Sequence, residues 1–165
     1  MSRSSKKVKR TKTMHKNTLS PELISRLYEL AEKGHKLTHN GQYMEAIYVW
    51  NEAIELIPEP KQNHLETANF IEAIAYNYQM LNLFPQALVF MKKLLRYWGE
   101  DVNRNPFILR SLGEIYYELG EMECAADYLR RAFILEGDEI FDADCYGKIE
   151  HNKYFEFLKN ESDFE

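Results

Sequence analysis

The 165-residue sequence lacks several features that mark other classes of protein. No apolar run exceeds five residues, so we expect no membrane-spanning segment, and no apolar stretch of the kind found in a secretory signal follows the basic N-terminus. The two cysteines, Cys124 and Cys145, have no paired spacing, which argues against a disulfide scaffold or zinc module and favours a reducing, cytoplasmic setting. Seven glycines and five prolines are too few for a strand-rich fold with many tight turns.

Catalytic motifs are missing as well. The sequence contains no G-x-S-x-G turn, no glycine loop that would cradle a phosphate and no H-E-x-x-H pair. His35 and His39 lie four residues apart and are spaced to share a metal ion on one helix, but no third ligand is identifiable. Glu114 and Glu118 have the same spacing, for which a solvated acidic face is the commoner interpretation. We therefore expect a binding module rather than an enzyme, with no cofactor and no bound metal.

Charge is distributed unevenly along the chain, whose formal net charge is −5. Residues 1–16 carry seven basic side chains and no acidic one, which leaves 14 Lys and Arg against 26 Asp and Glu, a net of −12, in the remainder. We expect residues 1–17 to form a disordered basic tail. The acidic body should attract basic partners and repel nucleic acid, so that the tail is the one candidate for a nucleic-acid contact.

Small residues recur at fixed intervals. Three segments each open on a small residue and have two marked positions 12 and then 7 residues further on: Gly34, Ala46 and Ala53; Ala75, Ala87 and Leu94; Gly113, Ala125 and Ala132. Between the last two positions of each set lies a large apolar residue: Trp50, Met91 and Leu129. Small residues let two helices approach closely, and a large side chain then fills the remaining gap. We therefore predict three helix pairs, 21–40 with 43–57, 64–81 with 84–97, and 106–119 with 122–135.

This spacing resembles the tetratricopeptide repeat, a helix–turn–helix unit of about 34 residues, over residues 27–137. The resemblance implies an all-α fold, an α-solenoid of three such helix pairs. Residues 58–62 and 99–103 are expected to be loops that absorb the extra length between units. Ser20 should cap the first helix, and a helical segment from about residue 138 should cap the last pair, which completes one domain over residues 18–160.

The first helix of each pair lines the concave surface of such a stack, so we predict the site there. The predicted partner-binding residues are Tyr28, His35, His39, Asn69, Glu72, Tyr76, Gln79, Arg110, Glu114, Tyr117 and Glu118. Interleaved aromatic and acidic side chains suit a basic, amphipathic segment, and core packing is the alternative for the aromatic ones. Family members that grip a C-terminal carboxylate use several Lys, Arg and Asn side chains, of which this set has only Asn69 and Arg110, so we do not expect a clamp of that kind. We expect Tyr76→Ala and Glu114→Lys to weaken binding without unfolding the protein.

Three short stretches indicate a class of partner. They are Ile-Pro-Glu-Pro-Lys at 57–61, Leu-Glu-Gly-Asp-Glu-Ile-Phe at 135–141 and Tyr-Phe-Glu-Phe-Leu at 154–158. Together they resemble a group of small bacterial repeat proteins encoded beside polymorphic (Rhs or contact-dependent) toxin genes. The resemblance implies an immunity protein that neutralises a cognate toxin, and an acidic body suits a basic toxin domain. The alternatives are a secretion chaperone that holds an extended segment of a secreted translocator, and a general scaffold or adaptor.

Overall fold

The computed structural model describes residues 18–142 and 144–161, and the regular structure in these residues is helical throughout. Seven α-helices follow one another: α1 (Pro21–His39), α2 (Tyr43–Leu56), α3 (Leu65–Met80), α4 (Phe84–Val102), α5 (Pro106–Glu118), α6 (Met122–Glu136) and α7 (Asn152–Lys159). Two short 3-10 turns, η1 (Lys61–Asn63) and η2 (Asp138–Phe141), lie between them. The predicted all-α class is confirmed, and the basic tail 1–17 lies outside the described residues.

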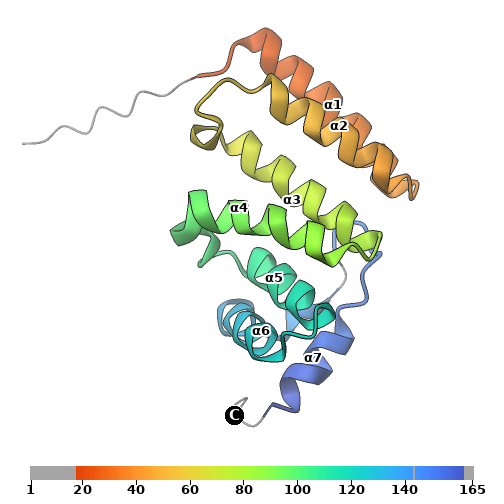
Figure 1. Cartoon of the computed structure of the whole chain (residues 1–165), viewed down its shortest axis with the longest axis vertical. Coiled ribbons are helices and arrows are strands. Elements are labelled where there is room, and N and C mark those ends of the chain that lie inside the picture. The colour runs from red at the N-terminus through yellow and green to blue at the C-terminus, as the bar shows by residue number, and fades with distance from the viewer. Residues whose placement is uncertain (1–17, 143, 162–165) are drawn as a thin grey trace, which may run out of the picture.

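Helices α1 to α6 pack mainly on their neighbours in sequence and follow one another along the length of the molecule (Figure 1). The predicted pairs correspond to α1 with α2, α3 with α4 and α5 with α6. Helix α7 packs against α6 and η2 at the far end. None of the described helices is long and apolar enough to cross a bilayer.

The starts of α1 and α5 are set by local signals in the sequence. The Ser20 side chain accepts a hydrogen bond from the backbone N–H of Leu23 at 3.2 Å, as predicted for the cap of α1. Asn105 caps α5 in the same way, accepting from Phe107 and Ile108, and Pro106 opens that helix. The first N–H groups of a helix have no hydrogen-bond partner inside it. By accepting from them, these side chains lower the free-energy cost of beginning the helix.

The small residues lie where paired helices come closest. A Cβ atom on Gly34 would be 2.5 Å from Cε2 of Trp50, and one on Gly113 would be 2.6 Å from Cγ of Leu129. Such distances are far inside van der Waals contact, so the glycines are required for the close approach of α1 to α2 and of α5 to α6. In the middle pair Ala75 is 1% exposed. The predicted contact of a small residue with a large apolar one is thus confirmed in the first and third pairs.

One predicted loop is wrong. Residues 99–103 were expected to connect two helices, but α4 continues to Val102 past a non-helical residue, Trp98 (φ −129°, ψ 33°). The side chain of Val102 is 1% exposed and packs in a cluster with Met91 and Leu112. Burial of this side chain stabilises the additional helical turn, although the low helix propensity of Gly99 favours an earlier end of the helix.

The other predicted loop, residues 58–62, is irregular up to Pro60 and then enters η1. Lys61 turns back on the preceding helix, and its Nζ donates to the carbonyl groups of Ile54 at 2.9 Å and Ile57 at 2.7 Å. These carbonyls lie at the C-terminal end of α2, where they lack partners within the helix and where positive charge is favoured. The connection is therefore tied to the helix it leaves.

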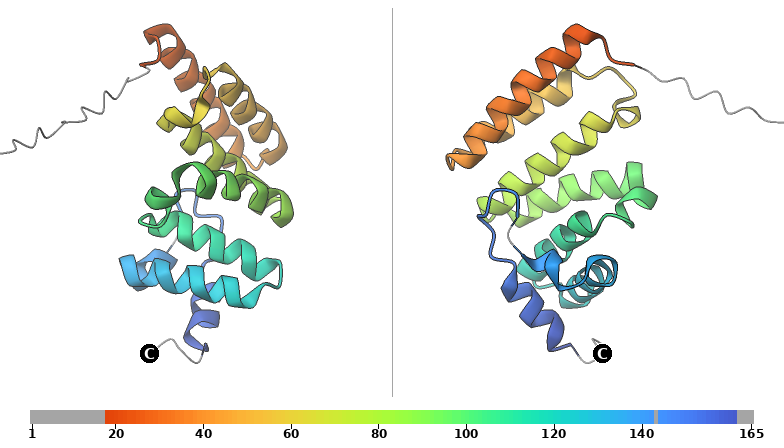
Figure 2. Two further views of the ribbon diagram at one scale, coloured as in Figure 1. Left: turned by 60° about the vertical axis from the view of Figure 1, so that its left-hand side comes forward. Right: turned by 180° about the vertical axis from the view of Figure 1, so that it is seen from behind.

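The chain beyond residue 138 packs against the last pair. Ile140, Tyr154 and Leu158 are buried in one cluster with Leu109 of α5 and Leu129 of α6. Between η2 and α7 the chain runs back along the molecule as far as α3 before it returns, as the rear view shows (Figure 2). We refer to residues 144–151 as the return segment. Its position was not predicted, and it decides which part of the predicted site is covered.

Candidate protein-binding grooves on the inner face

The predicted site residues come from α1, α3 and α5, and most of them lie on one side of the molecule. Two grooves open there, one between α1 and α3 and the other between α3, α5 and the return segment. His35, Asn69 and Ala73 line both, so the grooves are contiguous. We call this side the inner face.

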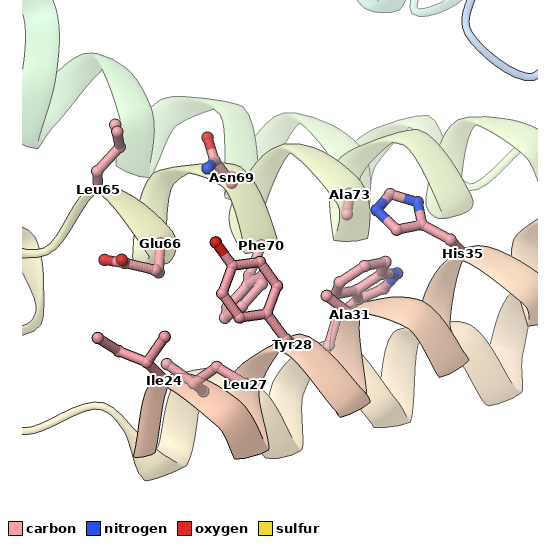
Figure 3. Close-up of a pocket in the computed structure, with 11 residues that line it drawn as sticks. Ile24, Leu27, Tyr28, Ala31, His35, Leu65, Glu66, Asn69, Phe70 and Ala73 are labelled. Carbon is pink, nitrogen blue, oxygen red and sulfur yellow. The ribbon is translucent and has the colours of Figure 1, made fainter. Parts of the chain in front are cut away.

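The groove between α1 and α3, which we call the apolar groove, has a volume of about 370 Å³. Its lining consists of Ile24, Leu27, Tyr28, Ala31, His35, Trp50, Leu65, Glu66, Asn69, Phe70 and Ala73. Tyr28 projects from α1 into the space before Phe70 of α3 (Figure 3). Tyr28 is 73% exposed and Leu65 70% exposed, although both are large and apolar. Exposed side chains of this kind around a groove are typical of a surface that binds another molecule.

The second groove, which we call the mixed groove, has a volume of about 360 Å³ and a more polar lining. It is lined by His35, Asn69, Glu72, Ala73, Tyr76, Gln79, Met91, Phe107, Ile108, Arg110, Ser111, Asp144, Cys145 and Tyr146. Burial raises the pKa of the Glu72 carboxyl to about 7, because a charged carboxylate is poorly solvated there. One wall of this groove is the return segment itself.

The return segment is anchored to α5 by buried charge. The ring nitrogen Nδ1 of His151 donates to the Glu114 carboxylate, and both side chains are 1% exposed. Arg110 lies on the other side, with its Nε 3.5 Å from Oε1 of Glu114, and its Nη1 donates to the carbonyl of Ile140. Since buried charges without partners are costly, each member of this group holds the others in place.

A second set of contacts continues this attachment along α5 and α7. Lys153 pairs with the Glu118 carboxylate, and Tyr154 Oη donates to it at 2.7 Å. The ring of Tyr154 also meets that of Tyr117 edge to face, with centroids 5.3 Å apart. The predicted site residues of α5 therefore contact the protein's own C-terminal segment.

Tyr146 joins the return segment to the two preceding pairs. Its ring centroid is 4.9 Å from that of Tyr76 on α3, and its hydroxyl hydrogen-bonds with Nδ1 of His35 on α1. His35, Tyr76 and Glu114 each directly follow the small residue of their segment, Gly34, Ala75 or Gly113. The three equivalent positions thus all contact the return segment.

The predicted residues consequently fall into three groups. Tyr28, His35 and Asn69 line the apolar groove, while Glu72, Tyr76 and Gln79 line the mixed groove together with Arg110. The C-terminal segment contacts the remaining residues of α5, Glu114, Tyr117 and Glu118. His39 is exposed and lines neither of these grooves. Among residues 18–142 and 144–161, no group of three or more His, Cys, Asp or Glu is placed to hold a metal ion.

The burial of Glu114 changes what its substitution would do. In Glu114→Lys, a second cation would lie beside Arg110 at a position 1% exposed to solvent. We expect such a change to destabilise the fold, so it cannot serve as a pure binding variant as the sequence suggested. That a partner contacts the accessible residues of the inner face stays a prediction.

Several residues of the grooves were missed from the sequence. Leu65 and Glu66 lie four and three positions before Asn69 on α3, and this helical spacing was a usable signal. Phe107, 56% exposed at the start of α5, lies three positions before Arg110, and the same spacing assigns it to the inward face. No comparable signal marked Tyr146, because residues 144–151 have no helical or strand periodicity.

No protein-family model matches the sequence, and no curated protein matches it significantly. The class of the protein is therefore defined by its structure: an all-α protein with sequentially packed helices and two contiguous grooves on one face.

Proposed function

We propose that this protein is a non-enzymatic binding module that takes up a segment of another polypeptide on its inner face. The observation that carries the proposal is the apolar groove, where Tyr28 and Leu65 stay exposed at a cost in free energy that a bound partner would remove. Large aromatic side chains at a groove are typical of the few residues that dominate binding energy. The finer fold that we propose is an α-solenoid of three tetratricopeptide-like pairs, supported by the repeated contact of glycine with a large apolar residue.

The partner that we propose is a basic toxin domain, which the protein neutralises as an immunity protein in the cytoplasm. Two observations support this role: the resemblance of the stretches at 57–61, 135–141 and 154–158 to immunity proteins, and the net charge of −12 outside the basic tail. Charge of opposite sign accelerates association and selects between partners. Nucleic acid is disfavoured as a partner by the same acidic body.

A second candidate is a secretion chaperone that holds an extended segment of a secreted translocator. The lining of the apolar groove favours it, because eight of the residues that form it have aliphatic or aromatic side chains: Ile24, Leu27, Tyr28, Ala31, Trp50, Leu65, Phe70 and Ala73. The two roles differ in what the partner does to a cell, since a toxin arrests growth and a translocator does not.

The test is co-expression with the product of the neighbouring gene in the native genome, followed by titration calorimetry of the purified pair. For an immunity protein we expect growth arrest by the neighbour alone and rescue by this protein. Growth without arrest together with tight binding supports the chaperone role instead. If the neighbour neither binds nor arrests growth, the immunity role is wrong.

A matched pair of variants locates the interface. Tyr28→Ala should weaken binding by about tenfold or more, because it removes an exposed ring from the apolar groove. The control is Tyr48→Ala, which removes a ring that is 68% exposed on α2 and lines neither groove. If the two variants bind equally well, the interface is not on the inner face.

A further inference from the structure

The two grooves lie next to each other but differ in chemistry. The apolar groove contains one carboxylate, that of Glu66, among mostly aliphatic and aromatic side chains. The mixed groove contains two, Glu72 and Asp144, on opposite walls formed by α3 and the return segment. Since His35 and Asn69 border both, neighbouring side chains of one bound segment can enter the two grooves together.

Two carboxyl groups line the mixed groove, and that of Asp144 accepts a hydrogen bond from the backbone N–H of Lys148 at 2.9 Å. Arg110 is the one cation among its lining residues, and its guanidinium is already engaged by Glu114 and by the carbonyl of Ile140. Neither Glu72 nor Asp144 forms an ion pair with another described residue. A cationic side chain is therefore the complementary occupant.

The protein's own C-terminal segment shows which chemistry the inner face accepts. Its aromatic residue Tyr146 lies against Tyr76, and its basic residues His151 and Lys153 pair with the carboxylates of Glu114 and Glu118. An aromatic side chain followed by basic ones thus already covers the inner face from Tyr76 on α3 to Glu118 on α5. The rest of α1 and α3, with Tyr28, Glu66 and Glu72, offers aromatic and acidic groups outside these contacts.

We propose that two neighbouring side chains of the partner segment are recognised. An aromatic or large aliphatic side chain binds in the apolar groove, and a lysine or arginine binds beside Glu72 in the mixed groove. This inference rests on the proposed function and specifies the chemistry of its partner. Glu66 and Tyr28 border the first position, and Asp144 and Tyr76 border the second.

The protonation of Glu72 gives the second position a pH dependence. Its pKa of about 7 reflects burial, and an approaching cation favours the charged form, so binding should tighten as the pH rises from 6 to 8. The groups that face this groove from the other elements are His35 on α1, Arg110 on α5, and Asp144, Cys145 and Tyr146 of the return segment. Burial lowers the pKa of His35, which limits its change of charge over this range.

The experiment uses the full-length protein and a library of random 12-residue peptides displayed on phage. We expect the selected peptides to carry an aromatic or large aliphatic residue within a few positions of Lys or Arg. One selected peptide is then synthesised with the cation intact and with norleucine in its place, and both are titrated against wild type, Glu72→Gln and Glu45→Gln. Glu45 lies on α2, is exposed and lines neither groove, so Glu45→Gln is the matched control.

For wild type and Glu45→Gln, loss of the peptide cation should weaken binding by about tenfold, and for Glu72→Gln by less than about twofold. An equal loss in all three proteins overturns the inference and leaves the proposed function standing, provided that Tyr28→Ala still weakens binding. Selection of peptides without Lys or Arg overturns it as well. If no peptide and no co-encoded polypeptide binds, the proposed function fails together with the inference. Thermal melts of each variant confirm that the comparison is made on folded protein.

Discussion

The two ends of the inner face are built alike and differ in what covers them. At the α5 end, Glu114 is buried between Arg110 and His151, and the C-terminal segment lies over it. At the α1 end, Tyr28 and Leu65 are more than two-thirds exposed at the rim of the apolar groove. At the covered end, acidic and aromatic side chains of α5 form ion pairs and ring contacts with the C-terminal segment. The open end offers side chains of the same kinds to another chain.

The boundary between the two ends lies at Tyr146 of the return segment, which contacts both α1 and α3. Beyond it the lining of the apolar groove comes from α1, α2 and α3 alone. The C-terminal segment therefore sets the length of the open surface, in addition to capping the last helix pair.

The largest expected effect breaks the covered end. In Glu114→Ala, Arg110 and His151 lose the carboxylate that they share, and a buried cation is left without a partner. We expect the free energy of unfolding to fall by about 3–5 kcal/mol, measured by urea denaturation. The control is Glu123→Ala, which removes an exposed carboxylate from α6 and should change the value by less than about 0.5 kcal/mol. Equal stabilities of the two variants would show that the buried group does not anchor the return segment.

The next effect tests the packing that both ends share. In Gly34→Ala and in Gly113→Ala, the new Cβ would overlap Trp50 or Leu129, and we expect each change to cost about 1–3 kcal/mol. Gly99→Ala is the matched control, since a Cβ there meets nothing within 4 Å and alanine favours the helix, so this change should stabilise. Thermal melts of the three variants measure the difference. A stabilised Gly34→Ala would contradict close approach of α1 and α2.

A third effect concerns Glu72, a carboxyl that lines the mixed groove between α3 and the return segment. Its pKa is about 7 in the folded protein and about 4.5 in a free chain, so between these values the folded protein holds a proton that the unfolded chain has lost. The free energy of unfolding should therefore fall as the pH rises from 4.5 to 7 and then level off, with a total contribution that partial exposure of the carboxyl reduces from about 3 to about 2 kcal/mol. Urea denaturation at pH 5 and pH 8 should show this decrease in wild type and a smaller one in Glu72→Gln. Parallel pH profiles for the two proteins would mean that the carboxyl is solvated.

The smallest effect sharpens the boundary between the ends. Tyr146→Ala removes a ring contact with Tyr76 and a hydrogen bond with His35, and we expect a loss of about 1–2 kcal/mol in the free energy of unfolding. Tyr48→Ala, which removes an exposed tyrosine from α2, should cost less than about 0.5 kcal/mol. Equal values would mean that the return segment is held by its α5 contacts alone.

Much of the helical framework could be predicted because its causes are local. Periodic apolar residues, the cap at Ser20 and the glycines at 34 and 113 each act within one helix or between neighbouring helices, and the structure confirms them. The predicted end of α4 was wrong, because burial of Val102 outweighs the weak helix propensity of Gly99. Seven of the eleven predicted site residues line the two grooves, because the first helix of each pair does face them. Which α5 residues are covered could be known only from the path of the C-terminal segment.

The sequence alone determined that the chain forms paired helices, because small and large residues at matching offsets specify which helix surfaces meet. Only the tertiary structure decided which acidic and aromatic residues are covered. His35 and Tyr146 are 111 positions apart, and Glu114 and His151 are 37 apart. Residues 144–151 have no helical or strand periodicity from which these contacts could be predicted. Their position follows from buried ion pairing and ring packing, which depend on the assembled helices and cannot be read from any one stretch of chain.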